Sequence, residues 1–184
     1  MKVEQIGVGN LDGLRRMKAV AVTDVLELYP ADRYLIPAEK DFLHKVIMPP
    51  GCMLLRELAD WLEIKFRPGN GTLFHKRLED DRVDNLVTLT ISGDFPEMAV
   101  AERRLKSAKW LLVTEDLNGA VKLVGTREQP LVALASYNST GRSWTVEWTG
   151  VTDMLPFYLP GYSQADLEGD GVSFDAGFDF GFDS

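Results

Sequence analysis

The stretch that decides the fold runs from Trp110 to Tyr158, WLLVTEDLNGAVKLVGTREQPLVALASYNSTGRSWTVEWTGVTDMLPFY. It contains four runs rich in β-branched and aromatic residues, WLLVTE, AVKLVG, LVALASY and WTVEWTG, which suit a pleated, half-buried sheet. The first two flank Asp116–Gly119, where Asn-Gly supplies the positive φ angles of a tight hairpin. The last two flank the polar connector Asn138–Ser143. The stretch therefore predicts four paired strands, and it carries almost no catalytic chemistry.

A strand and a capped helix precede this stretch. Asn85–Ser92 (NLVTLTIS) alternates in polarity and predicts a strand with one apolar face. Asp94 can then cap a helix, and Glu97 follows it by three residues as in a capping box. We expect the helix to run from about Phe95 to Ser107. Its apolar residues recur at helical spacing: Met98, Ala101, Leu105 and Ala108.

The remaining segments give weaker patterns. Met17–Leu28 (MKAVAVTDVLEL) favours a first pair of strands, and Trp61–Arg67 favours another strand. The turn Pro68–Gly71 leads into a further strand, TLFHKRLED. Tyr29–Gly51 holds four prolines and shows no sustained period. Irregular chain of that length within a domain often serves binding.

Together these patterns predict the fold class. We expect a mainly β (α+β) protein, with an antiparallel β-sandwich or half-barrel, one flanking α-helix, extended loops and a C-terminal arm. Residues 1–160 would form the β domain, with residues 29–51 as its long loop. Residues 161–184 would form the arm.

Composition is that of a folded soluble protein. The chain has 184 residues, 45% hydrophobic and 26% charged. No run approaches the roughly 20 apolar residues of a membrane span, and the first residues lack the apolar centre of a signal peptide. We therefore expect no membrane partner and a cytoplasmic location after synthesis.

The net charge of −8 is concentrated at the end of the chain. From Tyr162 to Ser184 there are acidic residues and no basic ones; the acidic residues are Asp166, Glu168, Asp170, Asp175, Asp179 and Asp183. Removing these from the 28 acidic residues leaves 22 against 20 basic ones. A nearly neutral body argues against binding duplex DNA through a strongly basic face.

No catalytic or metal-binding constellation is evident in the sequence. His44 and His75 lie in different segments, and Cys52 lies among apolar residues that favour a buried, inert thiol. The glycine-rich GVGNLDG precedes an expected strand, so the helix of a phosphate-binding loop is missing. The acidic clusters Glu79–Asp81 and Glu115–Asp116 fall at expected turns. We predict a protein without enzymatic activity, cofactor or metal; a hydrolase around Cys52 or His75 is a minor alternative.

The C-terminal FDAGFDFGFDS alternates phenylalanine with aspartate and glycine. A segment of this composition is not expected to form a hydrophobic core of its own, yet exposing its phenylalanines to water is unfavourable. One interpretation is a disordered solubilising tail. The other is an arm that docks its aromatic side chains onto a neighbouring subunit.

The chain from Asn85 onward resembles a group of virion proteins from tailed phages and prophages. The resembling residues are NLVTLTISGD, the helix, WLLVTEDLNGAVKLVGTREQPLVAL, and GRSWTVEWTG leading to PFYL; the early KAVAVTDV is similar too. The FD-rich end and the proline-rich segment lie outside this pattern. The resemblance implies a tail-tube-like protein, a family whose β-sandwich or half-barrel carries a helix on its flank and whose subunits stack as rings.

The resemblance implies a structural role in the virion tail, with assembly in the host cytoplasm. The expected partners are copies of the chain in rings and other tail or baseplate proteins, with transient passage of viral DNA. A hydrophilic, weakly acidic channel wall would repel the DNA backbone rather than trap it. A baseplate, distal-tail or head–tail joining protein of the same fold is the alternative within this class.

The segments expected to contact neighbouring subunits are Tyr29–Gly51, the hairpin region Pro68–Asp84 and the aromatic tail. We expect these contacts at Tyr34, Phe42, Phe74, Phe174, Phe178, Phe180 and Phe182. A rival hypothesis is a carbohydrate- or small-ligand-binding β domain. In that case Trp144 and Trp148, four residues apart on one strand face, would form an exposed stacking platform.

Overall fold

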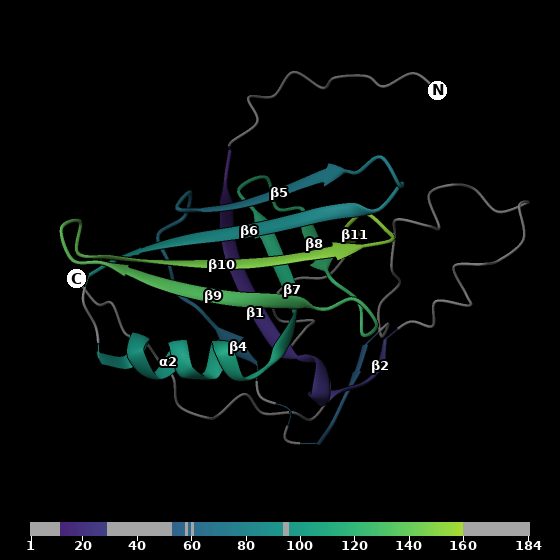
Figure 1. Cartoon of the computed structure of the whole chain (residues 1–184), viewed down its shortest axis with the longest axis horizontal. Coiled ribbons are helices and arrows are strands. Elements are labelled where there is room, and N and C mark those ends of the chain that lie inside the picture. Colours follow the sequence, from purple (N-terminus) through teal and green to yellow (C-terminus); the bar gives the residue numbers. More distant parts are fainter. Residues whose placement is uncertain (1–11, 29–52, 58, 60, 94–95, 160–184) are drawn as a thin grey trace, which may run out of the picture.

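A computed structural model describes residues 12–28, 53–57, 59, 61–93 and 96–159 (Figure 1). Within them the chain is mainly antiparallel β, with one α-helix and one short 3-10 turn. None of the described helices is long and apolar enough to cross a bilayer. The elements are β1 (Leu14–Ala21), η1 (Val22–Asp24), β2 (Val25–Leu28), β3 (Met53–Leu55), β4 (Leu62–Glu63), β5 (Gly71–Arg77), β6 (Val83–Ser92), α2 (Pro96–Ser107), β7 (Lys109–Asp116), β8 (Val121–Val124), β9 (Leu131–Asn138), β10 (Ser143–Thr152) and β11 (Phe157–Tyr158).

A nine-stranded sheet forms the body of the molecule. Its main path runs β11-β8-β7-β9-β10-β6-β5, and β1 pairs with both β7 and β4. β7 joins the two parts of the sheet, because Lys109 and Trp110 pair with β9 whereas later β7 residues pair with β1 and β8. Figure 1 shows β1 and β7 crossing behind β6, β10 and β9. A small second sheet consists of β2 and β3.

The main core lies between the two parts of the large sheet. In β6 every second residue from Val83 is buried, and β10 places Trp144, Val146 and Trp148 on the same side. The register sets Trp148 opposite Val87 and Trp144 opposite Ile91. Strict alternation on these strands follows from the pleat, since one face meets the core and the other meets solvent.

β1 and β7 differ because both of their faces are buried. Leu112 and Trp110 face the main core, whereas Leu111 and Val113 face a second core. That second core lies on the other side of β1 and β7 and consists of Val20, Val25, Trp61, Leu111, Val113, Leu123, Phe157 and Leu159. Burial on both faces explains why WLLV in β7 is a continuous apolar run rather than an alternating one.

Helix α2 packs its apolar stripe into the main core beside β9. Met98, Ala101 and Leu105 are buried, as the helical spacing predicted. The indole Nε1–H of Trp110 donates to the Leu105 carbonyl oxygen at 2.9 Å. This bond satisfies one of the carbonyls that the last turn of a helix leaves without an intrahelical partner.

The start of β1 bridges two distant turns and draws the sheet into a half-barrel. The Gly69 N–H donates to the Leu14 carbonyl at 2.9 Å, and the Leu117 N–H donates to the Gly13 carbonyl at 3.1 Å. Gly13 has φ +112°, and a Cβ there would lie 2.9 Å from the Gly69 Cα. Only glycine allows both the conformation and this approach of two backbones.

The structure confirms the predicted fold class, the two hairpins and the strand over Asn85–Ser92. Two finer predictions are wrong. The strands within Met17–Leu28 do not pair with each other, because β1 pairs with β7 and β4 whereas β2 pairs with β3. In Trp61–Arg67 only Leu62–Glu63 forms a strand. The predicted loop 29–51 and the arm 161–184 lie outside the described residues.

Candidate functional site: the open seam beside β5

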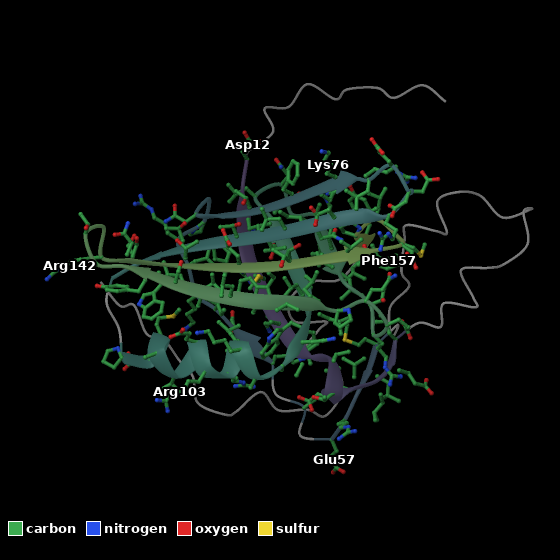
Figure 2. The ribbon with its side chains drawn as sticks, viewed as in Figure 1. Asp12, Glu57, Lys76, Arg103, Arg142 and Phe157 are labelled. Atoms are coloured by element: carbon green, nitrogen blue, oxygen red, sulfur yellow. The ribbon has the colours of Figure 1, made fainter. Side chains whose placement is uncertain are left out.

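The half-barrel leaves a seam between β5 and the β7–β8 hairpin. A cleft of about 550 Å³ occupies it, which we call the seam cleft. The walls come from four places: Asp12, Gly13 and Leu14 at the start of β1; Thr72 and Leu73 on β5; Thr114 and Asp116 on β7; and Asn118, Ala120 and Lys122 around the second turn. Figure 2 shows Asp12 and Lys76 on the same side of the molecule, near β5.

β5 forms one edge of the sheet, and its hydrogen-bonding register identifies the free groups. The Leu78 N–H donates to the Arg82 carbonyl, and the Thr90 N–H donates to the Asn70 carbonyl. With residue 74 opposite 86, this places the ladder bonds to β6 at the even-numbered residues of β5. The N–H and C=O groups of Leu73, His75 and Arg77 therefore point away from β6. Among the described residues no strand pairs with that side of β5.

The charge of Lys122 acts on His75 from across the seam. Partial burial lowers the pKa of His75, and the nearby charge of Lys122 lowers this pKa further. The Lys122 ammonium also lies 4.9 Å from the centre of the Tyr158 ring, a cation–π contact. Since His75 lies on β5 and Lys122 on β8, this electrostatic interaction spans the seam.

Replacing Lys122 by glutamine is expected to raise the pKa of His75 relative to the parent, because the charge across the seam is removed. A histidine whose pKa is lowered on folding costs nothing above its unfolded value of about 6.5 and opposes folding increasingly as the pH falls below it. The parent should therefore lose more stability than Lys122→Gln on acidification. NMR titration of the imidazole measures the first effect, and denaturant unfolding between pH 7 and pH 5 measures the second. An unchanged His75 pKa would contradict the seam electrostatics.

The acidic clusters are occupied by structural contacts. Asp80 forms an ion pair with Arg82 at 2.6 Å, which lowers the pKa of Asp80, and Asp81 pairs with Arg77 at 3.2 Å. Asp116 Oδ1 accepts hydrogen bonds from the N–H groups of Asn118 and Ala120, both at 2.9 Å. Glu115 lies between Arg15 and Arg16, on β1. These carboxylates organise turns and join strands. The turn placement of Glu79–Asp81 is confirmed, whereas Glu115 and Asp116 are the last residues of β7.

The outward surface of β5, β6, β10 and β9 is the other feature of note, and we call it the outer face. Four of its apolar side chains are well exposed: Phe74 57%, Val132 53%, Leu134 57% and Val151 37%. Cross-strand pairing connects Phe74 to Leu86, Leu86 to Thr149, and Thr149 to Val132. Helix α2 packs against the opposite side of β9, so no described helix covers this face.

The prediction of an exposed tryptophan platform is wrong. Trp144 and Trp148 do share one face, as predicted, but that face is the core, and their exposures are 8% and 0%. A sugar ring cannot stack on indoles buried in this way. Strand parity identifies residues on a common side, but it does not say which side meets solvent.

The predicted contact residues are only partly described. Phe74 is exposed on the outer face, beside the seam. Six others lie outside the described residues: Tyr34, Phe42, Phe174, Phe178, Phe180 and Phe182. His44 and Cys52 also lie outside them, whereas His75 is an exposed strand residue as predicted. In the described part of the chain, no group of three or more His, Cys, Asp or Glu side chains could hold a metal.

The sequence did not single out two polar residues, Lys122 in the wall of the seam cleft and Asn85 on the core side of β6. Lys122 lies in the middle of an apolar run, where it reads as an ordinary solvent-facing strand position. Asn85 is 1% exposed, and its Nδ2 donates to Thr152 Oγ1 at 2.8 Å across β6 and β10. Asn85 could have been noticed because it lies on the same strand face as Val87 and Leu89. For Lys122 the sequence held no such signal, because its neighbours in the cleft are distant in sequence.

Comparison of the chain with protein-family models, with curated proteins and with solved structures gave no match.

Proposed function

We propose that this chain is a structural virion protein of a tailed bacteriophage, which self-assembles into rings of the tail tube around the channel for genome delivery. Its partners are other copies of itself and neighbouring tail or baseplate proteins. A baseplate, distal-tail or head–tail joining protein is the second candidate, because it would use the same fold and the same surfaces.

The observation that carries the proposal is the outer face. It presents four exposed apolar side chains on β9, β10 and β5, and it ends at the free edge of β5. Contiguous apolar surface on a folded subunit typically marks an interaction site. A free sheet edge is normally a liability, which ordered assembly puts to use. The sequence resemblance to tail-tube-like proteins is the reason for proposing a ring of the tail tube rather than another assembly.

The described chemistry is consistent with an assembling subunit. The acidic clusters serve turns and strand contacts, and the exposed side of α2 carries an ion pair, Lys106 to Glu102 at 2.5 Å. Arg103 points away from the sheet on that same helix (Figure 2). The surplus acidity from Tyr162 onward gives each subunit a negative segment, which would repel a passing DNA backbone rather than bind it.

We expect the purified protein to form regular rings or stacked tubes in electron micrographs. Phe74→Glu and Leu134→Glu should each abolish them, because a carboxylate would be buried at the contact without a partner. Val100→Glu is the matched control, since Val100 is 59% exposed on α2, away from the outer face. Mass photometry would measure the same loss in solution.

Two outcomes would overturn the proposal. One is a chain that stays monomeric at high concentration and does not assemble on a tail or baseplate template. The other is assembly that Val100→Glu and Leu134→Glu impair equally. Stacked tubes would favour the tail tube, and single rings would favour the baseplate or head–tail joint.

A further inference from the structure

The free edge of β5 and the last residues of the chain have complementary patterns. The alternation of β5 places Thr72, Phe74 and Lys76 on the outer side and Leu73 and His75 on the inner side. Leu73 and Thr72, at the start of the strand, line the seam cleft. The chain ends in FDFGFDS, in which phenylalanine occupies every second position. Between them lie aspartate, glycine and aspartate. That period of two is the pattern of a strand with one aromatic side and one acidic side.

The seam cleft suits the aromatic side. Its walls include Leu14, Leu73 and Ala120, and its volume of about 550 Å³ has room for several side chains. Burying phenylalanine there removes a large apolar area from water, an effect that exceeds any exposed ion pair. Lys122 lines the cleft and can lie against an aromatic ring. The aromatic side should therefore face inward.

The acidic side then falls on the outer face. If Gly181 lies opposite Phe74 in an antiparallel pair, Asp179 lies opposite Lys76 and Asp183 opposite Thr72. Opposite charges paired across neighbouring strands are favourable, and an aromatic side chain next to an edge glycine covers the exposed backbone. The same register places Phe180 and Phe182 beside His75 and Leu73, whose N–H and C=O groups are the free ones.

The described chain ends beside the seam cleft, close enough for the C-terminal segment to reach β5. The Leu159 N–H donates to the Val121 carbonyl at 2.9 Å, next to Lys122 in the wall of the cleft. At about 3.3 Å per residue, the residues from 160 to 177 can span some 60 Å. That length reaches β5 on the same molecule or on a neighbouring one.

We propose that the segment Phe178–Ser184 adds to the free edge of β5 as an antiparallel strand, with its phenylalanines in the seam cleft. The free N–H and C=O groups of β5 would thereby gain hydrogen-bond partners. Main-chain hydrogen bonds supply the attachment, and the side-chain pattern sets the register, as in other strand additions. Supplied by a neighbouring copy, the same pairing would join subunits, but the inference does not depend on ring assembly.

Residue-resolved amide exchange of the full chain tests the pairing. The N–H groups of Thr72, Phe74 and Lys76 are held by β6 and should exchange slowly in every variant. Those of Leu73, His75 and Arg77 should be slow only when the added strand is present. In a triple variant, Phe178→Ser, Phe180→Ser and Phe182→Ser, we expect these three to exchange at least about tenfold faster. Phe174→Ser, which leaves FDFGFDS intact, is the control.

Disulfide trapping tests the register in the full chain carrying Cys52→Ser. Lys76→Cys combined with Asp179→Cys should form a disulfide, because directly opposed residues bring their Cα atoms within bonding range. Lys76→Cys combined with Asp183→Cys is the control and should not. Fast exchange of Leu73, His75 and Arg77 in the parent would overturn the proposal. So would protection that persists in the triple variant. Monomeric protein with protected odd amides would uphold this inference while counting against ring assembly.

Discussion

Replacing Trp110 by alanine is expected to lower the free energy of unfolding by about 3–5 kcal/mol. Trp110 is 1% exposed and lies where β7 pairs with β9, so its side chain fills the main core at the junction of the two parts of the sheet. Its indole also bonds to the Leu105 carbonyl at the end of α2. Truncation would leave a large cavity and an unsatisfied carbonyl together. Denaturant unfolding followed by circular dichroism would measure the loss.

A comparison with Trp148 separates the two contributions. Trp148 is fully buried on β10, but its Nε1 has no hydrogen-bond partner among the described residues. Trp148→Ala should cost about 1 kcal/mol less than Trp110→Ala, since both leave a cavity but only the latter breaks a hydrogen bond. In the phenylalanine variants, Trp110→Phe should cost about 1 kcal/mol more than Trp148→Phe, because only the former breaks a hydrogen bond. Equal costs for the two phenylalanine variants would show that the Trp110–Leu105 bond contributes nothing.

Local chemistry determined the elements that the sequence predicted correctly. The Asn118–Gly119 turn gives φ +84° at the glycine, and Asp116 caps the turn with its side chain. The polarity of Asn85–Ser92 alternates because one of its faces meets the core. The helix begins and ends close to its predicted bounds because its apolar spacing is unambiguous. Each of these signals lies within a dozen residues of sequence.

Pairing between distant segments could not be read from the sequence. Nothing in Met17–Leu28 indicates that β1 pairs with β7, about a hundred residues away, rather than with β2. The continuous apolar run of β7 follows from burial on both faces, which a pattern alone cannot distinguish from other buried segments. The seam is non-local in the same way, since Thr72 and Lys122 face one cleft from opposite ends of the fold. A contact surface was expected around Phe74, but neither the free edge nor the cleft was.

The seam cleft and the outer face would serve different contacts, the first with the C-terminal segment and the second with a neighbouring subunit. A phenylalanine-rich strand in the cleft would complete the half-barrel, and it would cover the free groups of β5. The outer face would remain open for a neighbouring subunit. The two surfaces meet at β5, where Leu73 lines the cleft and Phe74 lies on the outer face, so a change in one is expected to affect the other. Leu134 on β9 lies outside this overlap and reports on the outer face alone.

Gly13→Ala is expected to destabilise the protein by about 2–5 kcal/mol, through backbone strain and overpacking together. Its φ of +112° disfavours any side chain, and the new Cβ would lie 2.9 Å from the Gly69 Cα and 3.2 Å from the Gly69 carbonyl oxygen. Both of those atoms belong to backbone that the hydrogen bond from Gly69 to Leu14 holds in place. The approach of β1 to the turn before β5 would have to open, and the seam cleft with it.

Gly119→Ala is the matched control for this prediction. Gly119 also has a positive φ, +84°, yet a Cβ there meets nothing within 4 Å. It should therefore cost about 1–2 kcal/mol, the strain term alone. The excess cost of Gly13→Ala over Gly119→Ala measures how firmly the two backbones are held together, and urea unfolding of both variants would give it. If the two variants lost the same stability, the contact between Gly13 and Gly69 would be loose, and the half-barrel would depend on its side-chain core rather than on this backbone junction.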